Sequence, residues 1–409
     1  MLESTKNLKV LILLHILTIV VSAAVLTFLI PPQGYSGTGH FLLEDDGYYR
    51  ISEEFVGGGS LFYRGRGFGL ALIYSAIHFF PNSLHPYVRL ILSLTFNIFT
   101  LVILRLIASR YITDREFFLG GVLLIFNPAF VHFTIKSVPD NYLAFFVTCF
   151  AYFFLKSYYS DSVVLCFVIA SLVLVFSIFI RPSVLLIPPV LMLIGIVNRN
   201  RKLFILAFIL LMICMSAFMA FRTVTDLKGE DNKAGYTTGV HDFIWDTYLI
   251  ENILRSGKIE KGTYLPAHSV ESNQHDAIRR YRAWRDAYSM KNPDSGSYRV
   301  LLDFIRENPV SVTIKFCVNP IFVFTLGSRT IEFYINLVFT ALLMGFLVIG
   351  IRHMERDLGV WIILGIGGGY LLTFVIIHVA ARYSVGIIAL LSIFAGKGFQ
   401  TVLRKIGNK

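Results

Sequence analysis

Long runs of apolar residues, separated by short polar or charged connections, are the main feature of this chain. Residues 10–30, 88–108 and 331–351 each approach or exceed the roughly 20 apolar residues that a helix needs to cross a bilayer core. The pattern predicts an all-α polytopic membrane protein with about 10 transmembrane helices, or about 12 if two shorter segments also cross. The ten helices of the preferred assignment cover residues 10–30, 87–108, 116–134, 139–156, 162–180, 182–197, 203–222, 331–351, 358–379 and 383–403.

Positive charges gather in one set of the predicted connections. If the N-terminus is cytoplasmic, the inner connections hold Arg105, Arg110, Arg115, Lys156, Arg199, Arg201, Lys202, Arg352, Arg356, Arg404, Lys405 and Lys409. The short outer connections then hold only Lys136, Arg181 and Arg382. Cytoplasmic loops of membrane proteins carry an excess of Lys and Arg, so we expect both termini to be cytoplasmic.

Two segments between the predicted spans are long, 31–86 and 223–330. Residues 68–80 form an apolar stretch that is too short for a span, and counting it as one would invert every later connection against the charge rule. We therefore expect a juxtamembrane helix there, lying in the interface or re-entering the bilayer. Residues 316–326 pose the same problem and predict a second interfacial helix.

The composition turns polar between Thr223 and Pro309, where residues 276–288 and 297–307 have the pattern of amphipathic helices. This segment predicts a small, mainly helical outer cap. The expected organisation is an N-terminal membrane module over 1–222, the cap with its juxtamembrane helix over 223–330, and C-terminal transmembrane helices over 331–409.

Composition supports the membrane assignment and restricts the partners. Only 15% of the residues are charged, against about 25% in soluble domains. The net charge of +11 is explained by positive inner loops, so it does not predict a nucleic-acid partner. The four cysteines lie in apolar stretches without paired spacing, which predicts neither a disulfide framework nor a metal site.

The first outer segment contains an acidic motif, Glu44-Asp45-Asp46-Gly47-Tyr48-Tyr49-Arg50. Adjacent carboxylates can hold a divalent cation, or one of them can take the proton of an acceptor hydroxyl. The alternative is a solvated acidic turn. Arg64 and Arg66 follow in a glycine-rich stretch that has no preceding strand, so we interpret it as a connection whose arginines contact a headgroup or substrate.

A second set of charged residues occupies the other outer connections. Asp140 begins a predicted helix, where an ionisable residue is either an N-cap, a site residue, or both. Arg181 and Arg382 break the charge rule, and a guanidinium is suited to hold a phosphate at the membrane surface. Their alternative role is to reach lipid headgroups. His378, one turn before Arg382, is either part of this set or a buried polar contact.

The order of these features resembles the GT-C superfamily of integral-membrane glycosyltransferases, in particular the branch with protein O-mannosyltransferases and lipid A aminoarabinose transferases. The similarity covers most of the chain, and each piece is short. The matching pieces are Asp45-Asp46-Gly47-Tyr48-Tyr49, Gly67-Phe68-Gly69-Leu70, Asn127-Pro128-Ala129-Phe130 with Pro139-Asp140, Arg181-Pro182 and Arg382-Tyr383. The family often has Asp-Glu where this chain has Asp45-Asp46, so the division of labour within the pair is open.

The resemblance implies an inverting enzyme of the cell envelope that transfers a sugar from a polyprenyl-phosphate donor to a lipid, glycan or protein acceptor on the outer face. Asp45 would be the general base, and Asp46 would assist through a hydrogen bond or a bound Mg²⁺ or Mn²⁺. The remaining implied site residues, which would contact the donor phosphate or the substrates, are Arg382, Arg181, Lys136, Asp140, Tyr48, Arg64, Arg66, Tyr383 and His378.

Two other classes of membrane protein are alternatives. A transporter or flippase of lipid-linked sugars would place ionisable residues near the middle of its spans and contain broken helices. A surface-polysaccharide polymerase or ligase would depend on outer arginines with a His or Glu. The compact length slightly favours a bacterial or archaeal cytoplasmic membrane, with membrane lipids as the constant partners.

Overall fold

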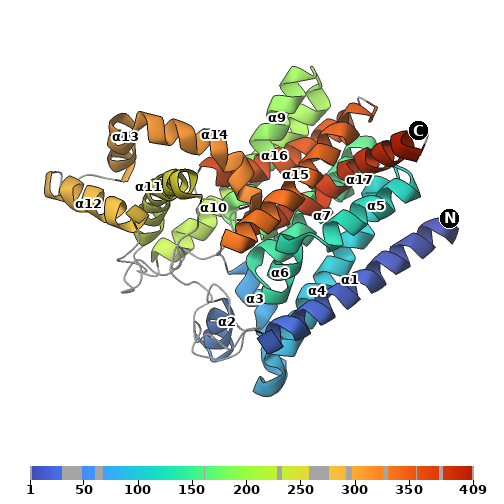
Figure 1. Cartoon of the computed structure of the whole chain (residues 1–409), viewed down its shortest axis with the longest axis horizontal. Helices are drawn as coiled ribbons and strands as arrows, with labels where there is room; N and C mark the ends of the chain where they lie inside the picture. Colours follow the sequence, from blue (N-terminus) through green and yellow to red (C-terminus); the bar gives the residue numbers. More distant parts are fainter. Residues whose placement is uncertain are drawn as a thin grey trace.

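The apolar runs form helices that pack side by side, and the chain is an integral membrane protein with an all-helical architecture (Figure 1). The computed structural model describes residues 2–29, 48–59, 68–160, 162–227, 233–257, 276–291, 297–325, 330–355, 357–376 and 381–407. The helices of the main bundle are α1 (Leu2–Leu29), α4 (His85–Ala108), α5 (Asp114–Ile125), α6 (Pro128–Lys136), α7 (Pro139–Tyr159), α8 (Val163–Ile180), α9 (Ile187–Val197), α10 (Arg201–Leu227), α15 (Thr330–Arg352), α16 (Leu358–Ile376) and α17 (Val385–Gly407). Short helices connect or precede them: α2 (Tyr48–Val56), α3 (Gly69–Ser75), η2 (Ala76–Phe79), η3 (Asn82–Leu84), η4 (Pro182–Leu186) and η6 (Ala381–Ser384).

Within the described part of the chain, six helices are long and apolar enough to cross a membrane, or seven if one bent pair counts as a span. The expected number of about 10 therefore stays a prediction. Helices α9 and α16 are apolar but shorter than a full span by this measure. The expected juxtamembrane helix at 68–80 is formed by α3 and η2, which together are also too short to cross.

The bent pair corrects one expectation. Residues 116–134 were expected to form a single helix, but α5 ends at Ile125 and α6 begins at Pro128, with an angle of 60° between them. Proline has no backbone N–H to continue the helix, so Pro128 begins a new one. The Asn127 side chain caps this new helix by accepting a hydrogen bond from the Phe130 N–H at 3.1 Å.

Helix α17 is the centre of the bundle, where it packs against α5, α7 and α15. Its residues from Val385 to Gly396 are all buried, in contrast to the lipid-facing sides of α1 and α10. Glycines allow the close approach, because a Cβ at Gly396 would overlap the backbone of α5, and one at Gly398 or Gly350 would overlap the facing backbone of α15 or α17. Close packing of small residues is a principal source of helix association in membranes.

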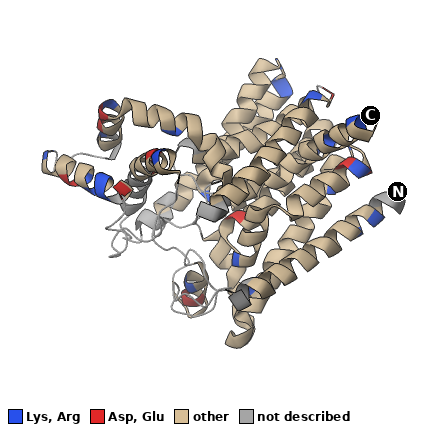
Figure 2. Cartoon of the chain, viewed as in Figure 1, with Lys and Arg blue, Asp and Glu red and all other residues tan. Residues whose placement is uncertain are grey.

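Charge is distributed unevenly over the molecule (Figure 2). Lys and Arg lie at the ends of the bundle helices on the side that also holds both chain termini, where acidic residues such as Asp114 and Glu116 pair with some of them, and the helices at the opposite end also carry both signs (Figures 1 and 2). The marked ends of the chain lie on the same side of the bundle in the view of Figure 1. Which side faces the cytoplasm stays a prediction.

The segment expected to form the outer cap contains α11 (Lys233–Ser256), α12 (Asp276–Lys291), α13 (Ser297–Glu307) and α14 (Pro309–Thr325). Helices α12 and α13 correspond to the two amphipathic helices expected at 276–288 and 297–307, and α14 includes most of the expected interfacial segment 316–326. A fully buried pair joins α14 to α11: the Lys315 Nζ lies 3.9 Å from the Asp246 Oδ2 and donates to the Phe243 carbonyl at 2.9 Å. The limits of the three expected domains stay predictions.

We predict that Gly350→Ala weakens the contact between α15 and α17. The added methyl group would overlap the Phe394 carbonyl, and such overpacking costs about 1–3 kcal/mol. The matched control is Gly345→Ala on the same helix, where a Cβ meets nothing within 4 Å. Thermal unfolding in detergent should show a lower Tm for Gly350→Ala than for Gly345→Ala; equal values would contradict the packing described here.

Candidate functional site

The structure describes some of the expected site residues and leaves others out. Asp45, Asp46, Arg64, Arg66 and His378 lie outside the described residues. Arg382 lies in η6, but its side chain is outside the description. The described side chains are Lys136, Asp140, Arg181, Tyr48 and Tyr383, and two of these, Asp140 and Arg181, form an ion pair.

Asp140 and Arg181 meet although 41 positions separate them in the sequence. The Arg181 Nη1 lies 3.4 Å from the Asp140 Oδ1; the carboxylate is fully buried and the guanidinium side chain is 17% exposed. The Tyr370 hydroxyl donates to the same Oδ1 at 3.4 Å. An ionised carboxylate removed from water needs a counter-charge and hydrogen-bond donors, and these two partners supply both.

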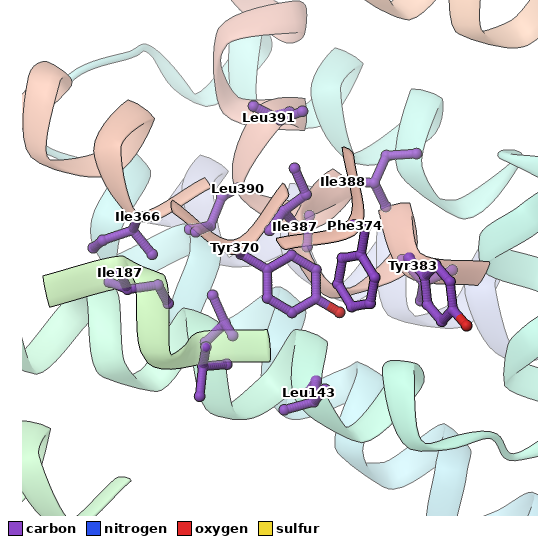
Figure 3. Packing of buried hydrophobic residues seen from close by; sticks show 14 of the residues in the cluster. Leu143, Ile187, Ile366, Tyr370, Phe374, Tyr383, Ile387, Ile388, Leu390 and Leu391 are labelled. Atoms are coloured by element: carbon purple, nitrogen blue, oxygen red, sulfur yellow. The ribbon is translucent and has the colours of Figure 1, made fainter. Parts of the chain in front are cut away.

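Aromatic rings form the wall next to the guanidinium. The Arg181 Cζ lies 4.8 Å from the ring centroid of Tyr383 and 5.9 Å from that of Phe374. The rings of Tyr383 and Phe374 stack at 4.1 Å with an interplanar angle of 12°. Figure 3 shows Tyr370, Phe374 and Tyr383 as a row of three rings, contributed by α16 and η6. These ring contacts stabilise the positive charge of the Arg181 guanidinium.

Local sequence explains why Asp140 lies at this point. Pro139 is the first residue of α7, and Asp140 lies in its first turn, where the helix dipole favours a negative charge. The N-cap residue is Val138, and no side chain caps this end. Of the two alternatives for Asp140, the structure therefore does not show the N-cap: its carboxylate turns to Arg181 and Tyr370.

Arg181 is placed by the end of α8. It is the C-cap residue and has an extended backbone with φ −157° and ψ 123°. Pro182 disfavours the helical conformation for the residue before it, so α8 ends at Ile180. The Thr373 hydroxyl then ties α16 to η4 by donating to the Ser183 carbonyl at 2.9 Å. Since Arg181 pairs with Asp140, the alternative that it only reaches lipid headgroups does not fit the structure.

The C-terminal end of α6, which includes Lys136, accepts hydrogen bonds from residues that the sequence did not single out. Arg89 of α4 is fully buried and donates to the Lys136 carbonyl at 3.1 Å. Tyr74 of α3 donates to the Ser137 carbonyl, and Ser93 of α4 donates to the Thr134 carbonyl at 2.8 Å. The C-terminal carbonyl groups of a helix have no partners within the helix, and a cation is favourable there.

Two signals in the sequence could have pointed to these residues. Arg89 is an ionisable residue near the start of a predicted span, which is a default indication of a site. Tyr370 is a polar-tipped ring in an otherwise aliphatic and glycine-rich run, which is a weaker signal. Ser137 adopts a positive φ of 53°, which sequence alone does not reveal.

The remaining expected residues show different surroundings. Tyr48 is buried at the start of α2, and the side chain of Lys136 is half-buried in the last turn of α6. Among the described residues, no group of three or more His, Cys, Asp or Glu side chains could hold a metal ion. The expected cation ligands Asp45 and Asp46 lie outside that part of the chain.

Comparisons with known proteins give little guidance. No protein-family model matches the sequence, and no curated protein matches it. Among solved structures, the chain is similar to the crystal structure of ArnT from Cupriavidus metallidurans in the apo state, with a TM-score of 0.38 and 14% identity. The match covers 95% of this chain and 77% of that chain. Values this low establish neither a common fold nor a common activity.

We predict that Asp140 and Arg181 are energetically coupled. Removing one partner of a buried pair costs roughly 3–5 kcal/mol, so Asp140→Asn and Arg181→Gln should each lower the free energy of unfolding strongly. The double variant should lose less than the sum, with a coupling of about 1–3 kcal/mol.

The control for this cycle is the exposed pair Asp276–Arg279 on α12, whose charged atoms are also 3.4 Å apart. Its side chains are 47% and 63% exposed, so the cycle of Asp276→Asn with Arg279→Gln should give a coupling below about 1 kcal/mol. Denaturant unfolding in detergent measures both cycles. Equal coupling energies would show that burial adds nothing to the Asp140–Arg181 pair.

Proposed function

We propose that this protein is a membrane glycosyltransferase that moves a sugar from a polyprenyl-phosphate donor to an acceptor on the outer face of the membrane. The observation that carries the proposal is the meeting of Asp140, Arg181 and the aromatic wall at the junction of α7, α8, α16 and η6. The backbone of Arg382 belongs to the same junction, because η6 contains both Arg382 and Tyr383.

The charges at this junction suit a lipid-linked phosphate. A guanidinium held in place by a carboxylate and by aromatic rings is preorganised, so it need not reorient when negative charge develops on a departing phosphate. Arg382 and Lys136 would add positive charge from neighbouring turns. The lipid-facing sides of the surrounding helices offer an apolar environment for a polyprenyl tail, since many of their large side chains are exposed.

The proposed chemistry is an inverting displacement at the anomeric carbon. Asp45 removes the proton of the acceptor hydroxyl as its oxygen attacks, and the polyprenyl phosphate leaves with the electrons of the glycosidic bond. Asp46 assists through a hydrogen bond or a bound Mg²⁺ or Mn²⁺. The acceptor is a lipid, a glycan or a protein, and the residues do not distinguish among these classes.

One observation favours a transporter as the second candidate. The bent pair α5–α6, with its angle of 60°, resembles the broken helices that surround substrates in transporters. A transporter would move the lipid-linked sugar between the leaflets of proteoliposomes without releasing it from its carrier. Radiolabel transfer from the polyprenyl phosphate to an acceptor separates the two candidates.

We predict that Asp45→Asn lowers the rate of sugar transfer by about 10²–10⁴-fold, because a positioned general base contributes this much. The measurement is radiolabel transfer by purified protein in nanodiscs, with a panel of polyprenyl-phosphate sugars and acceptors. The same change at the exposed Asp276 of the cap should leave the rate unchanged. Normal transfer by Asp45→Asn would refute the proposed role of this residue.

We also predict that Arg382→Gln lowers kcat by about 10²–10³-fold, the usual cost of losing one group that stabilises developing charge. The matched control is Arg299→Gln on α13, whose side chain is 72% exposed. Both variants should retain the Tm of the unmodified protein. A change confined to the KM for the donor would instead assign Arg382 to ground-state binding.

A further inference from the structure

Four polar side chains, which we call the histidine cluster, meet where α2 packs against the chain that leads into α4. The cluster consists of Tyr49 and Ser52 of α2, His78 of η2 and His85 at the start of α4. Helix α2 contacts α3 and lies apart from the main bundle in the view of Figure 1. Tyr49 belongs to the acidic motif, but none of the four is among the residues to which the sequence analysis assigns a role in the site.

Two hydrogen bonds determine which ring nitrogen of neutral His85 carries the hydrogen. Its Nε2 lies 2.8 Å from the Phe80 carbonyl oxygen, which can only accept, so Nε2 carries a hydrogen. In the neutral ring, Nδ1 is then an acceptor, and the Tyr49 hydroxyl donates to it at 2.5 Å. His85 is 1% exposed, and both of its nitrogens are engaged. It therefore does not contact a substrate directly.

A second link joins the next turn of α2 to the same place. The Ser52 hydroxyl lies 2.9 Å from the His78 Nε2 and donates to the Tyr49 carbonyl at 2.6 Å. The three rings also touch: the centroids of His78 and His85 are 5.1 Å apart, and those of Tyr49 and His78 are 5.2 Å apart. A helix of nine residues is marginal by itself, so these side-chain contacts hold α2 in place.

We propose that His85, acting through Tyr49, is a positioning residue that sets where the acidic motif enters the site. Asp46 and Asp45 precede the first residue of α2 by two and three positions, so the placement of α2 limits where their carboxylates can reach. This inference rests on the proposed function of Asp45. The histidine cluster would position the acidic motif, whereas the charged junction of Asp140 and Arg181 would bind the donor phosphate.

The charges near the cluster indicate how it depends on pH. Burial lowers the pKa of His78 from 6.5, and repulsion from the charged form of the neighbouring His85 would lower it further, while Glu53 opposes both. The titratable groups that face His78 are Tyr49 and Glu53 from α2 and His85 from α4. A lowered pKa means that the assembled cluster favours neutral His78, so the attachment of α2 weakens as the pH falls below about 6.5.

Two substitutions of His85 separate the two hydrogen bonds. Asparagine places an acceptor near the former Nδ1 and keeps the bond from Tyr49, whereas glutamine places a donor near the former Nε2 and keeps only the bond to Phe80. The first test is amide hydrogen exchange of residues 48–56 in the full-length protein in nanodiscs. His85→Gln and Tyr49→Phe should each speed exchange by about 2- to 10-fold, and the double variant should add nothing further.

The controls in this experiment are Ser83→Ala, an exposed change two residues before His85, and His85→Asn; both should exchange at the unmodified rate. If His85→Gln fails to fold, Ser52→Ala tests the same attachment from the other link. Unchanged exchange in Tyr49→Phe would overturn the proposal, as would equal exchange in the Asn and Gln variants of His85.

The second test separates positioning from a merely structural role. Tyr49→Phe and His85→Gln should lower kcat for transfer and leave the KM for the donor unchanged, with His85→Asn close to the unmodified enzyme. Faster exchange with an unchanged kcat would overturn the positioning role. If Asp45→Asn retains normal transfer, the proposed function fails, while the exchange experiment still reports independently on how α2 is attached.

Discussion

The arrangement of the bundle where α7, α8, α16 and η6 meet depends on one buried ion pair, Asp140 with Arg181. A carboxylate that is fully buried is costly unless its charge is matched, so the partners cannot separate without a large loss of stability. Because Asp140 lies in the first turn of α7 and Arg181 is the C-cap residue of α8, the pair joins two helix termini. Tyr370 and Tyr383 add α16 and η6 to the same point, so four segments from both halves of the chain are joined there.

Hydrogen bonds to α3 and α4 fix the turn that precedes α7, and thereby the position of this pair. The carbonyl groups at the end of α6 accept hydrogen bonds from Arg89, Tyr74 and Ser93, which stand on α3 and α4. A buried guanidinium at a helix C-terminus is favourable both as a donor and as a charge. The position of Asp140 is thus determined twice: by the dipole of its own helix and by the attachment of the helix that precedes it.

Much of the architecture follows from local pattern. Long apolar runs predict membrane helices, and amphipathic spacing predicts α12 and α13 with their ends close to the observed ones. The break between α5 and α6 was missed, because an apolar run continues across Phe126 and Asn127 and hides the effect of Pro128. Helices α2 and α11 were missed too, because both lie in segments that the sequence analysis interpreted as a connection or as part of a polar cap, and α2 has only nine residues.

The sequence by itself determined that this chain resides in a membrane, that it is helical, and that a few charged residues fall in connections where the charge rule does not expect them. Only the tertiary structure decided which of those residues meet. The pairing of Asp140 with Arg181, the support from Arg89 and the histidine cluster join positions on different helices, and local propensity carries no information about such contacts. The physical reason is that membrane helices associate through close packing and buried polar contacts, whose partners become known only when the helices are assembled.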